Sequence, residues 1–306
     1  MTRTITTVID LIPGEILPLA TIQAESLTEQ AFWDQYVRKT TPVLIKGAAA
    51  AWPAIQSWKH PSYLQGRCGD IMVEVSHTFN ASPQLETAAQ QRQRLQECIA
   101  EMCSAADDIT ISAPAIDIPE SWQADIGEFR FLRARNRNPL GYPRRRIFLY
   151  KNASTEWHYH PLDETLTTQL VGSKRVSLFR LTRSSWFKFA PLIKANFHHM
   201  PCGQSFFPSD IRLQKFQGDL DAGDALYIPP FWWHGIDAAN AVPGITLAHC
   251  FRSPLSRFGN WNDPVTRELL SDALRFNKLR FVPLLILILL SSLSRKVKRE
   301  SWIIDS

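Results

Sequence analysis

The fold is decided by two stretches, Trp157-His158-Tyr159-His160 and Gly223-Asp224-Ala225-Leu226-Tyr227-Ile228-Pro229-Pro230-Phe231-Trp232-Trp233-His234. Side chains alternate between the two faces of a β-strand, so His158 and His160 point the same way while Tyr159 points the other. The second stretch predicts a tight turn, a short buried strand and a proline stop, which place His234 just past the strand's end. A small β-barrel would bring these three histidines onto one metal ion. Three imidazole ligands suit iron, zinc, copper or nickel and leave coordination positions free for a substrate.

Length and composition are those of an enzyme-sized globular chain. The 306 residues are 45% hydrophobic and include ten Trp and seventeen Phe, which is enough for a full core with an aromatic-lined interior. The net charge of +5 comes partly from two local clusters, 144–146 and 295–299, so the total charge does not by itself indicate nucleic-acid binding. We therefore expect no nucleic-acid partner.

Cysteine usage and the N-terminus predict a cytoplasmic protein. The five cysteines are odd in number and form no Cys-x-x-Cys pair, which argues for a reducing compartment. The first twenty residues mix Asp10, Pro13 and Glu15 among the apolar ones, a pattern that does not fit a secretory signal.

The C-terminal part, residues 256–306, is expected to be a helical extension. Its apolar segment 281–293 reads FVPLLILILLSSL between basic flanks and is shorter than the roughly twenty residues that cross a bilayer. Three placements stay open for this segment: a helix packed on its own core, a homodimer contact, or peripheral contact with a membrane interface.

Hydrophobic patterning predicts one mainly β domain over residues 1–255. The first part is a mixed α/β lead-in, with a capping box at Ser26-Leu27-Thr28-Glu29 that starts a helix and a second helix over 85–106. From residue 144 to 253 the pattern changes to short strands separated by turns, which fits an antiparallel barrel or jelly roll. The expected strands are 147–151, 156–160, 165–170, 176–181, 225–228 and 245–251.

Several motifs in a fixed order resemble the JmjC-type cupin-like family over roughly residues 20–255. They are Thr41-Pro42-Val43-Leu44-Ile45-Lys46-Gly47, Trp52-Pro53, Trp58, Thr155-Glu156-Trp157-His158, Gly172-Ser173-Lys174-Arg175 and the stretch that ends at His234. The resemblance implies a double-stranded β-helix that binds Fe(II) and 2-oxoglutarate and uses O2 to hydroxylate a protein side chain or a small molecule.

The resemblance also implies roles for individual residues. His158 matches the first iron ligand and His234 the distal histidine. Lys174 matches the cation that pairs with the far carboxylate of 2-oxoglutarate, and Thr155 matches a hydroxyl that hydrogen-bonds the same group. His249 lies where the family often has a polar residue near the cosubstrate, although a buried core histidine fits its position equally well.

Two departures from the family pattern concern the same region. The family usually has Asp two residues after the first ligand, whereas this chain has His160 there. One residue more than expected separates His158 from Lys174, which predicts a local bulge or a shifted register.

The altered motif also resembles the wider cupin pattern. There, two histidines are followed by a carboxylate, here Glu164 with Asp163 as the competing choice, and His234 is the last ligand. Such proteins include metalloenzymes that use no keto acid and plain binding proteins, so both remain alternatives to the oxygenase. The aromatic residues Trp157, Tyr159, Trp232 and Trp233 either line a substrate mouth or belong to the core. Substrate choice is expected to depend on 82–119 and 192–216.

Overall fold

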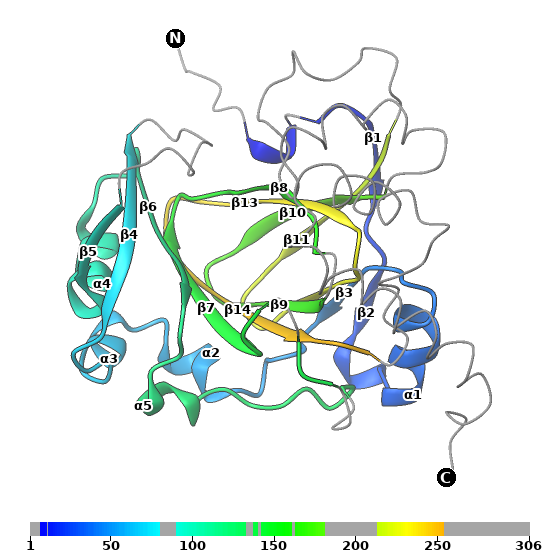
Figure 1. Cartoon of the computed structure of the whole chain (residues 1–306), viewed down its shortest axis with the longest axis horizontal. Helices are drawn as coiled ribbons and strands as arrows, with labels where there is room; N and C mark the ends of the chain where they lie inside the picture. Colours follow the sequence, from blue (N-terminus) through cyan, green and yellow to red (C-terminus); the bar gives the residue numbers. More distant parts are fainter. Residues whose placement is uncertain are drawn as a thin grey trace, which may run out of the picture.

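The computed structural model describes residues 7–10, 12–79, 90–132, 137–139, 142–160, 163–180 and 213–253. Within these ranges the strands form a five-stranded sheet, in the order β1-β11-β10-β13-β8, and a nine-stranded sheet, in the order β2-β3-β12-β9-β14-β7-β6-β4-β5. Figure 1 shows the two sheets facing each other, so that together they form the walls of the barrel. The strands are β1 Glu15–Pro18, β2 Thr21–Gln23, β3 Val43–Lys46, β4 Met72–Phe79, β5 Gln90–Arg94, β6 Ile109–Ile116, β7 Arg145–Lys151, β8 Thr155–His158, β9 Glu164–Val171, β10 Lys174–Phe179, β11 Gln214–Leu220, β12 Ala225–Ile228, β13 Trp233–Ala238 and β14 Pro243–Phe251.

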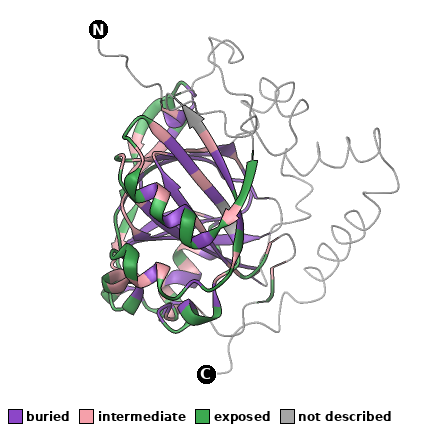
Figure 2. Ribbon diagram, turned by 90° about the vertical axis from the view of Figure 1, so that its left-hand side faces the viewer, coloured by how far each residue is buried: buried purple, intermediate pink, exposed green. Residues whose placement is uncertain are grey.

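The central strands of the nine-stranded sheet are covered on both faces, which explains their long buried runs. β9 and β14 are buried along almost their whole length and pair antiparallel with each other (Figure 2). Alternate residues of each strand therefore face the barrel interior or the outer layer. This arrangement confirms the predicted mainly β jelly roll with its mixed α/β lead-in.

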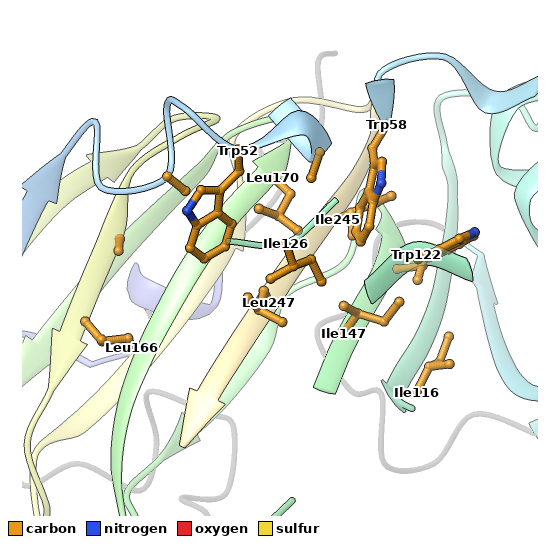
Figure 3. Packing of buried hydrophobic residues seen from close by; sticks show 14 of the residues in the cluster. Trp52, Trp58, Ile116, Trp122, Ile126, Ile147, Leu166, Leu170, Ile245 and Leu247 are labelled. Atoms are coloured by element: carbon orange, nitrogen blue, oxygen red, sulfur yellow. The ribbon is translucent and has the colours of Figure 1, made fainter. Parts of the chain in front are cut away.

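Short helices other than η1 cover the outer face of the nine-stranded sheet. The helical elements are η1 Val8–Asp10, η2 Ala24–Ser26, α1 Glu29–Phe32, the π-helical η3 Trp33–Val37, α2 Pro53–Ser57, α3 Pro61–Gln65, α4 Leu95–Ser104 and α5 Glu120–Gln123. Trp58 and Trp122 pack against each other with ring centroids 5.1 Å apart, and they belong to the same hydrophobic cluster as the outward-facing Leu170 and Leu247 (Figure 3). These contacts fix the helical layer to the sheet.

The barrel interior is apolar on one side and polar on the other. The apolar part comes from strands of both sheets, so it lies between them: Leu19, Leu44, Val176, Leu178, Leu220, Leu226, Ile228, Trp232 and Ile236. The polar part is formed by the inward-facing residues of β7, β8, β9 and β14, together with His234 of β13 and Lys174 of β10, and it contains the functional residues described below.

The N-terminal turn η1 is fastened to the outer face of the five-stranded sheet. The Asp237 carboxylate accepts hydrogen bonds from the backbone amides of Val8 and Ile9, at 2.9 and 3.0 Å. The Lys215 ammonium donates to the carbonyl oxygens of Ile9 and Ile12, at 3.0 and 2.6 Å. Residues far apart in the sequence thus hold the N-terminal segment in place.

Two helix predictions are wrong in detail. Thr28, not Ser26, caps α1, since its hydroxyl accepts from the Ala31 amide at 3.1 Å. The helix expected over 85–106 begins only at Leu95, because Gln90–Arg94 pairs with β4 as an exposed edge strand. Backbone pairing outweighs the helical propensity of this Gln- and Arg-rich segment. Its first residues, up to 89, lie outside the described ranges.

The C-terminal predictions fall outside the described residues. Residues 256–306 as a helical extension, a homodimer contact through it, and membrane contact through 281–293 all stay predictions, as does the domain boundary at 255. Among the described residues, no helix is both long enough and apolar enough to cross a membrane.

Candidate functional site

Three histidines converge at one end of the barrel. His158 lies directly opposite His234 in the antiparallel pairing of β8 with β13, and their ring centroids are 4.1 Å apart. His160 follows β8, with its ring 5.1 and 4.9 Å from the other two. One ligand atom from each residue lies within 4.8 Å of the others. As expected, His234 lies past the end of β12, and it is the second residue of the next strand, β13.

Each imidazole is oriented by a hydrogen bond at Nδ1. His158 Nδ1 donates to the Glu156 carbonyl at 2.7 Å, and His234 Nδ1 donates to the Trp232 carbonyl at 3.0 Å. A carbonyl oxygen only accepts, so in the neutral rings Nδ1 carries the proton and Nε2 carries the lone pair. The Thr165 hydroxyl holds Nδ1 of His160 at 3.0 Å. Such partners set the tautomer and direction of metal-binding histidines.

Neither carboxylate considered as a further ligand belongs to this histidine group. Glu164 faces the outer side of β9, where it accepts from the Tyr227 hydroxyl at 2.9 Å and from the Ser253 amide. Its burial raises its pKa to about 7. Asp163 is also fully buried and accepts from the Tyr142 amide at 3.2 Å.

A bulge places Thr155 on the same face as His158. Along a regular strand, residues three apart face opposite sides. Here Thr155 pairs with Ile236 while His158 pairs with His234, so three residues of β13, 234–236, lie opposite four residues of β8, 155–158. Opposed residues share a face, and Ile236 belongs to the interior cluster. Thr155 therefore faces the barrel interior, half-buried.

Lys174 also faces the interior, as the first residue of β10. Its side chain is buried, and Nζ lies 4.0 Å from the centroid of the Tyr150 ring. Burial lowers its pKa from 10.5 to about 7, an effect partly opposed by the charge of Asp237. Among the described residues no carboxylate forms an ion pair with it. The predicted bulge between His158 and Lys174 is present in β9, where Leu170 is the extra residue opposite β14.

A buried polar network lies beside Lys174 and was not foreseen from the sequence. Gln169 donates to the Tyr150 hydroxyl at 2.6 Å and accepts from the Thr246 hydroxyl at 2.9 Å. Burial raises the pKa of Tyr150, so its hydroxyl stays neutral. Tyr150, Gln169 and Thr246 come from three adjacent strands, and only the sheet register reveals that they meet.

His249 belongs to the outer layer and not to the barrel interior. Its Nδ1 accepts from Arg145 Nε at 3.2 Å, and its ring packs edge-on against Phe129. Burial, reinforced by the charges of Arg145 and Arg144, lowers its pKa to about 3. It lines a cavity of about 910 Å³ outside the barrel. His249 is therefore a buried histidine of the outer layer, as the second of the two interpretations predicts, and it does not face the barrel interior.

The four aromatic residues near the histidines are core residues. All are buried, and Trp157 and Trp232 donate to the carbonyl oxygens of Val8 and Thr40, at 2.7 and 2.8 Å. The ring of Tyr159 packs on that of Trp233 at 4.8 Å. Among the described residues, the Tyr142 ring does contact the histidine group, with its centroid 5.2 Å from that of His160, and the sequence analysis missed it.

Two further described histidines, His60 and His77, lie away from the site. His77, on β4, pairs with Glu101 of α4 at 2.8 Å. His60 is an exposed residue that precedes α3. His198, His199 and the segment 192–212 lie outside the described residues.

Comparison with known proteins agrees with this architecture. A family model described as a cupin-like domain matches residues 29–253. Lysine-specific demethylase JMJ30 from Arabidopsis thaliana is 24% identical over 245 residues, in a match that covers 74% of this chain and 54% of that protein. The chain thus spans about half the length of this curated relative. The jelly roll and the histidine group agree with this match, which covers most of the chain. The chain belongs to the JmjC-type cupin-like family.

Proposed function

We propose that this protein is an Fe(II)- and 2-oxoglutarate-dependent oxygenase that hydroxylates a protein side chain or a small molecule. The observation that carries the proposal is the shared interior of the barrel. It holds three converging imidazoles and, on a neighbouring strand, a buried lysine without a carboxylate partner among the described residues. A buried amine is costly unless it meets an anion, and a keto acid supplies one.

The residues fit a divalent iron. Three imidazole nitrogens are suitable donors for Fe(II), and their Nδ1 hydrogen bonds direct the Nε2 atoms inward. When bound, the iron with 2-oxoglutarate would supply the oxidation of a C–H bond by O2. The chain's own residues would orient the keto acid: Lys174 would bind its far carboxylate, and the Thr155 hydroxyl would hydrogen-bond the same group.

A protein substrate is the first to test. The Arabidopsis relative is named a lysine-specific demethylase, a name that describes an enzyme acting on protein lysine. We extend only the class of substrate, and small molecules stay in the proposal. The described cysteines are all free thiols, in keeping with the proposed cytoplasmic location.

His160 supports a second candidate function. A neutral imidazole where the family usually has a carboxylate leaves the metal less negative, which favours a cupin metalloenzyme that needs no keto acid, or a binding module that has lost its chemistry.

An anaerobic titration separates these functions. Fe(II) and then 2-oxoglutarate are added to the metal-free protein, and the weak visible charge-transfer band of the chelate is recorded. The oxygenase predicts a band in the wild type that fades in Lys174→Ala. Iron binding without a band would favour the enzyme that needs no keto acid. A band seen only in His160→Asp would indicate a barrel that has lost its oxygenase chemistry.

A further inference from the structure

The barrel contains a second buried cation, Arg146, on the inner face of β7. Ile147 and Leu149 of β7 belong to the hydrophobic cluster outside the barrel. Because side chains alternate along a strand, Arg146, Phe148 and Tyr150 share the opposite, inward face. The Arg146 guanidinium carbon lies 3.9 Å from the centroid of the Tyr142 ring. Tyr142 in turn packs on His160. One aromatic ring therefore separates this guanidinium from the histidine group.

Arg146 has no anionic partner among the described residues. It is 9% exposed, and its Nε atom is buried without a hydrogen-bond partner. Asp163 accepts from the Tyr142 backbone amide nearby, yet no ion pair joins its carboxylate to Arg146. A permanently charged group held away from water without a counterion is destabilising. Such a group is retained at low cost when a ligand supplies the missing anion.

The position of Arg146 separates it from the proposed 2-oxoglutarate site. Lys174 packs on Tyr150, four residues further along β7, and four residues of strand span about 13 Å. The two cations therefore mark opposite ends of the interior face of β7, with Arg146 at the end where Tyr142 and His160 lie. The planar guanidinium binds a carboxylate through two parallel hydrogen bonds, a geometry that an ammonium cannot match.

We propose that Arg146 anchors the substrate of this site and that the substrate group it binds is a carboxylate, such as an acidic side chain next to the reacting residue. This role in substrate binding rests on the proposed function, but carboxylate binding by Arg146 can be tested without any measurement of activity. Arg146 is a specificity-determining residue in this scheme, and Lys174 keeps the keto acid.

The test compares two matched probes, N-acetyl-glutamate N-methylamide and N-acetyl-glutamine N-methylamide. Each is titrated calorimetrically into the full chain, first metal-free and then loaded with redox-inert Zn(II) and saturating 2-oxoglutarate. Wild type should bind the glutamate probe at least about tenfold more tightly than the glutamine probe. Arg146→Gln should abolish this preference, and Arg146→Lys should keep part of it. Arg145→Gln is the matched control, because this neighbouring arginine faces the outer layer and pairs with Glu128.

Protein stability and 2-oxoglutarate affinity complete the design. Removing a buried cation that lacks an anionic partner should leave the melting temperature of Arg146→Gln equal to or above that of wild type, so loss of preference would not reflect unfolding. Its 2-oxoglutarate affinity should also be unchanged. Equal affinity of wild type for the two probes, a preference that survives Arg146→Gln, or a selective loss of 2-oxoglutarate binding in this variant would each overturn the proposal. Failure of wild type to bind metal or 2-oxoglutarate would instead count against the proposed function, because the metal-free titration reports on Arg146 separately.

Discussion

His158 and His234 are cross-strand neighbours, directly opposite each other on β8 and β13. The pairing of β8 with β13 therefore fixes the position of both histidines. A small change between these strands should move both metal ligands at once, whereas His160 depends on a separate contact with Thr165.

Gly235, next to His234, gives the first prediction. A Cβ atom at this position would lie 2.8 Å from Cε2 of Trp157, the residue before His158. Gly235→Ala should therefore push the Trp157 ring and shift β8, lowering the free energy of unfolding by about 1–3 kcal/mol and weakening Zn(II) binding. Gly218→Ala is the control, since its Cβ would meet neighbours only at 3.4 Å or more. Equal metal affinity in the two variants would contradict this role.

Thr165→Val tests the support of His160. The substitution keeps the shape of the side chain but removes the hydroxyl that holds Nδ1, so the affinity for Zn(II) should fall by about tenfold. Thr168→Val on the same strand removes a buried hydroxyl that has no hydrogen-bond partner, and should leave metal binding unchanged and stability equal or higher. Metal affinities measured by competition with a chelator would show whether the two variants differ.

Lys174 predicts a characteristic dependence of stability on pH. Its pKa is about 7 in the folded protein and about 10.5 when unfolded, so between these values the unfolded chain binds more protons. The free energy of unfolding therefore rises with pH across that window. The destabilisation caused by burying the charged Lys174 is fully present below pH 7 and is lost as the pH rises. Lys174→Met should melt at a higher temperature than wild type near pH 7, with the difference shrinking toward pH 10. A constant difference across this range would argue that Lys174 is not buried without a partner.

The same pKa predicts how 2-oxoglutarate affinity changes with pH. Above about pH 7, Lys174 must take up a proton before it can pair with a carboxylate. Affinity for the keto acid on the Zn(II)-loaded protein should therefore decline by up to tenfold for each pH unit above 7. Calorimetry in buffers of different ionisation enthalpy would detect the proton uptake. Its absence at pH 8 would place the far carboxylate elsewhere.

Gly244→Ala should disturb the Lys174 end of the barrel. A Cβ at this position would lie 2.1 Å from Cζ of Tyr150, too close for the ring to keep its place. Tyr150 would have to leave its contacts with Lys174 and Gln169, so we expect a clear loss of stability together with weaker 2-oxoglutarate binding. Metal affinity should change less than in Gly235→Ala, because Gly244 lies away from the histidines. A larger loss of metal affinity in Gly244→Ala than in Gly235→Ala would contradict the separation of the Lys174 end of the barrel from the histidine end.

Local sequence patterns predicted the barrel and its lead-in because strand alternation and turn residues are local signals. They also singled out the histidines that the structure brings together. They could not fix register. The bulge in β8 that turns Thr155 inward arises from its pairing with β13, and nothing in residues 155–158 alone signals it. For the same reason the outward face of His249 and the inward face of Arg146 were not foreseen: a residue's face depends on which strands cover it.

The hold of Asp237 on Val8 and Ile9 has a consequence for biosynthesis. These partners are 229 and 228 residues apart in the chain, and β1 and β3 likewise pair with β11 and β12. The N-terminal segment leaves the ribosome long before its partner strands have been synthesised. The first strands therefore remain unpaired until the second half of the barrel has emerged. We expect the nascent chain to stay sensitive to protease and dependent on chaperones until translation has passed β13, and then to become protected in one late step.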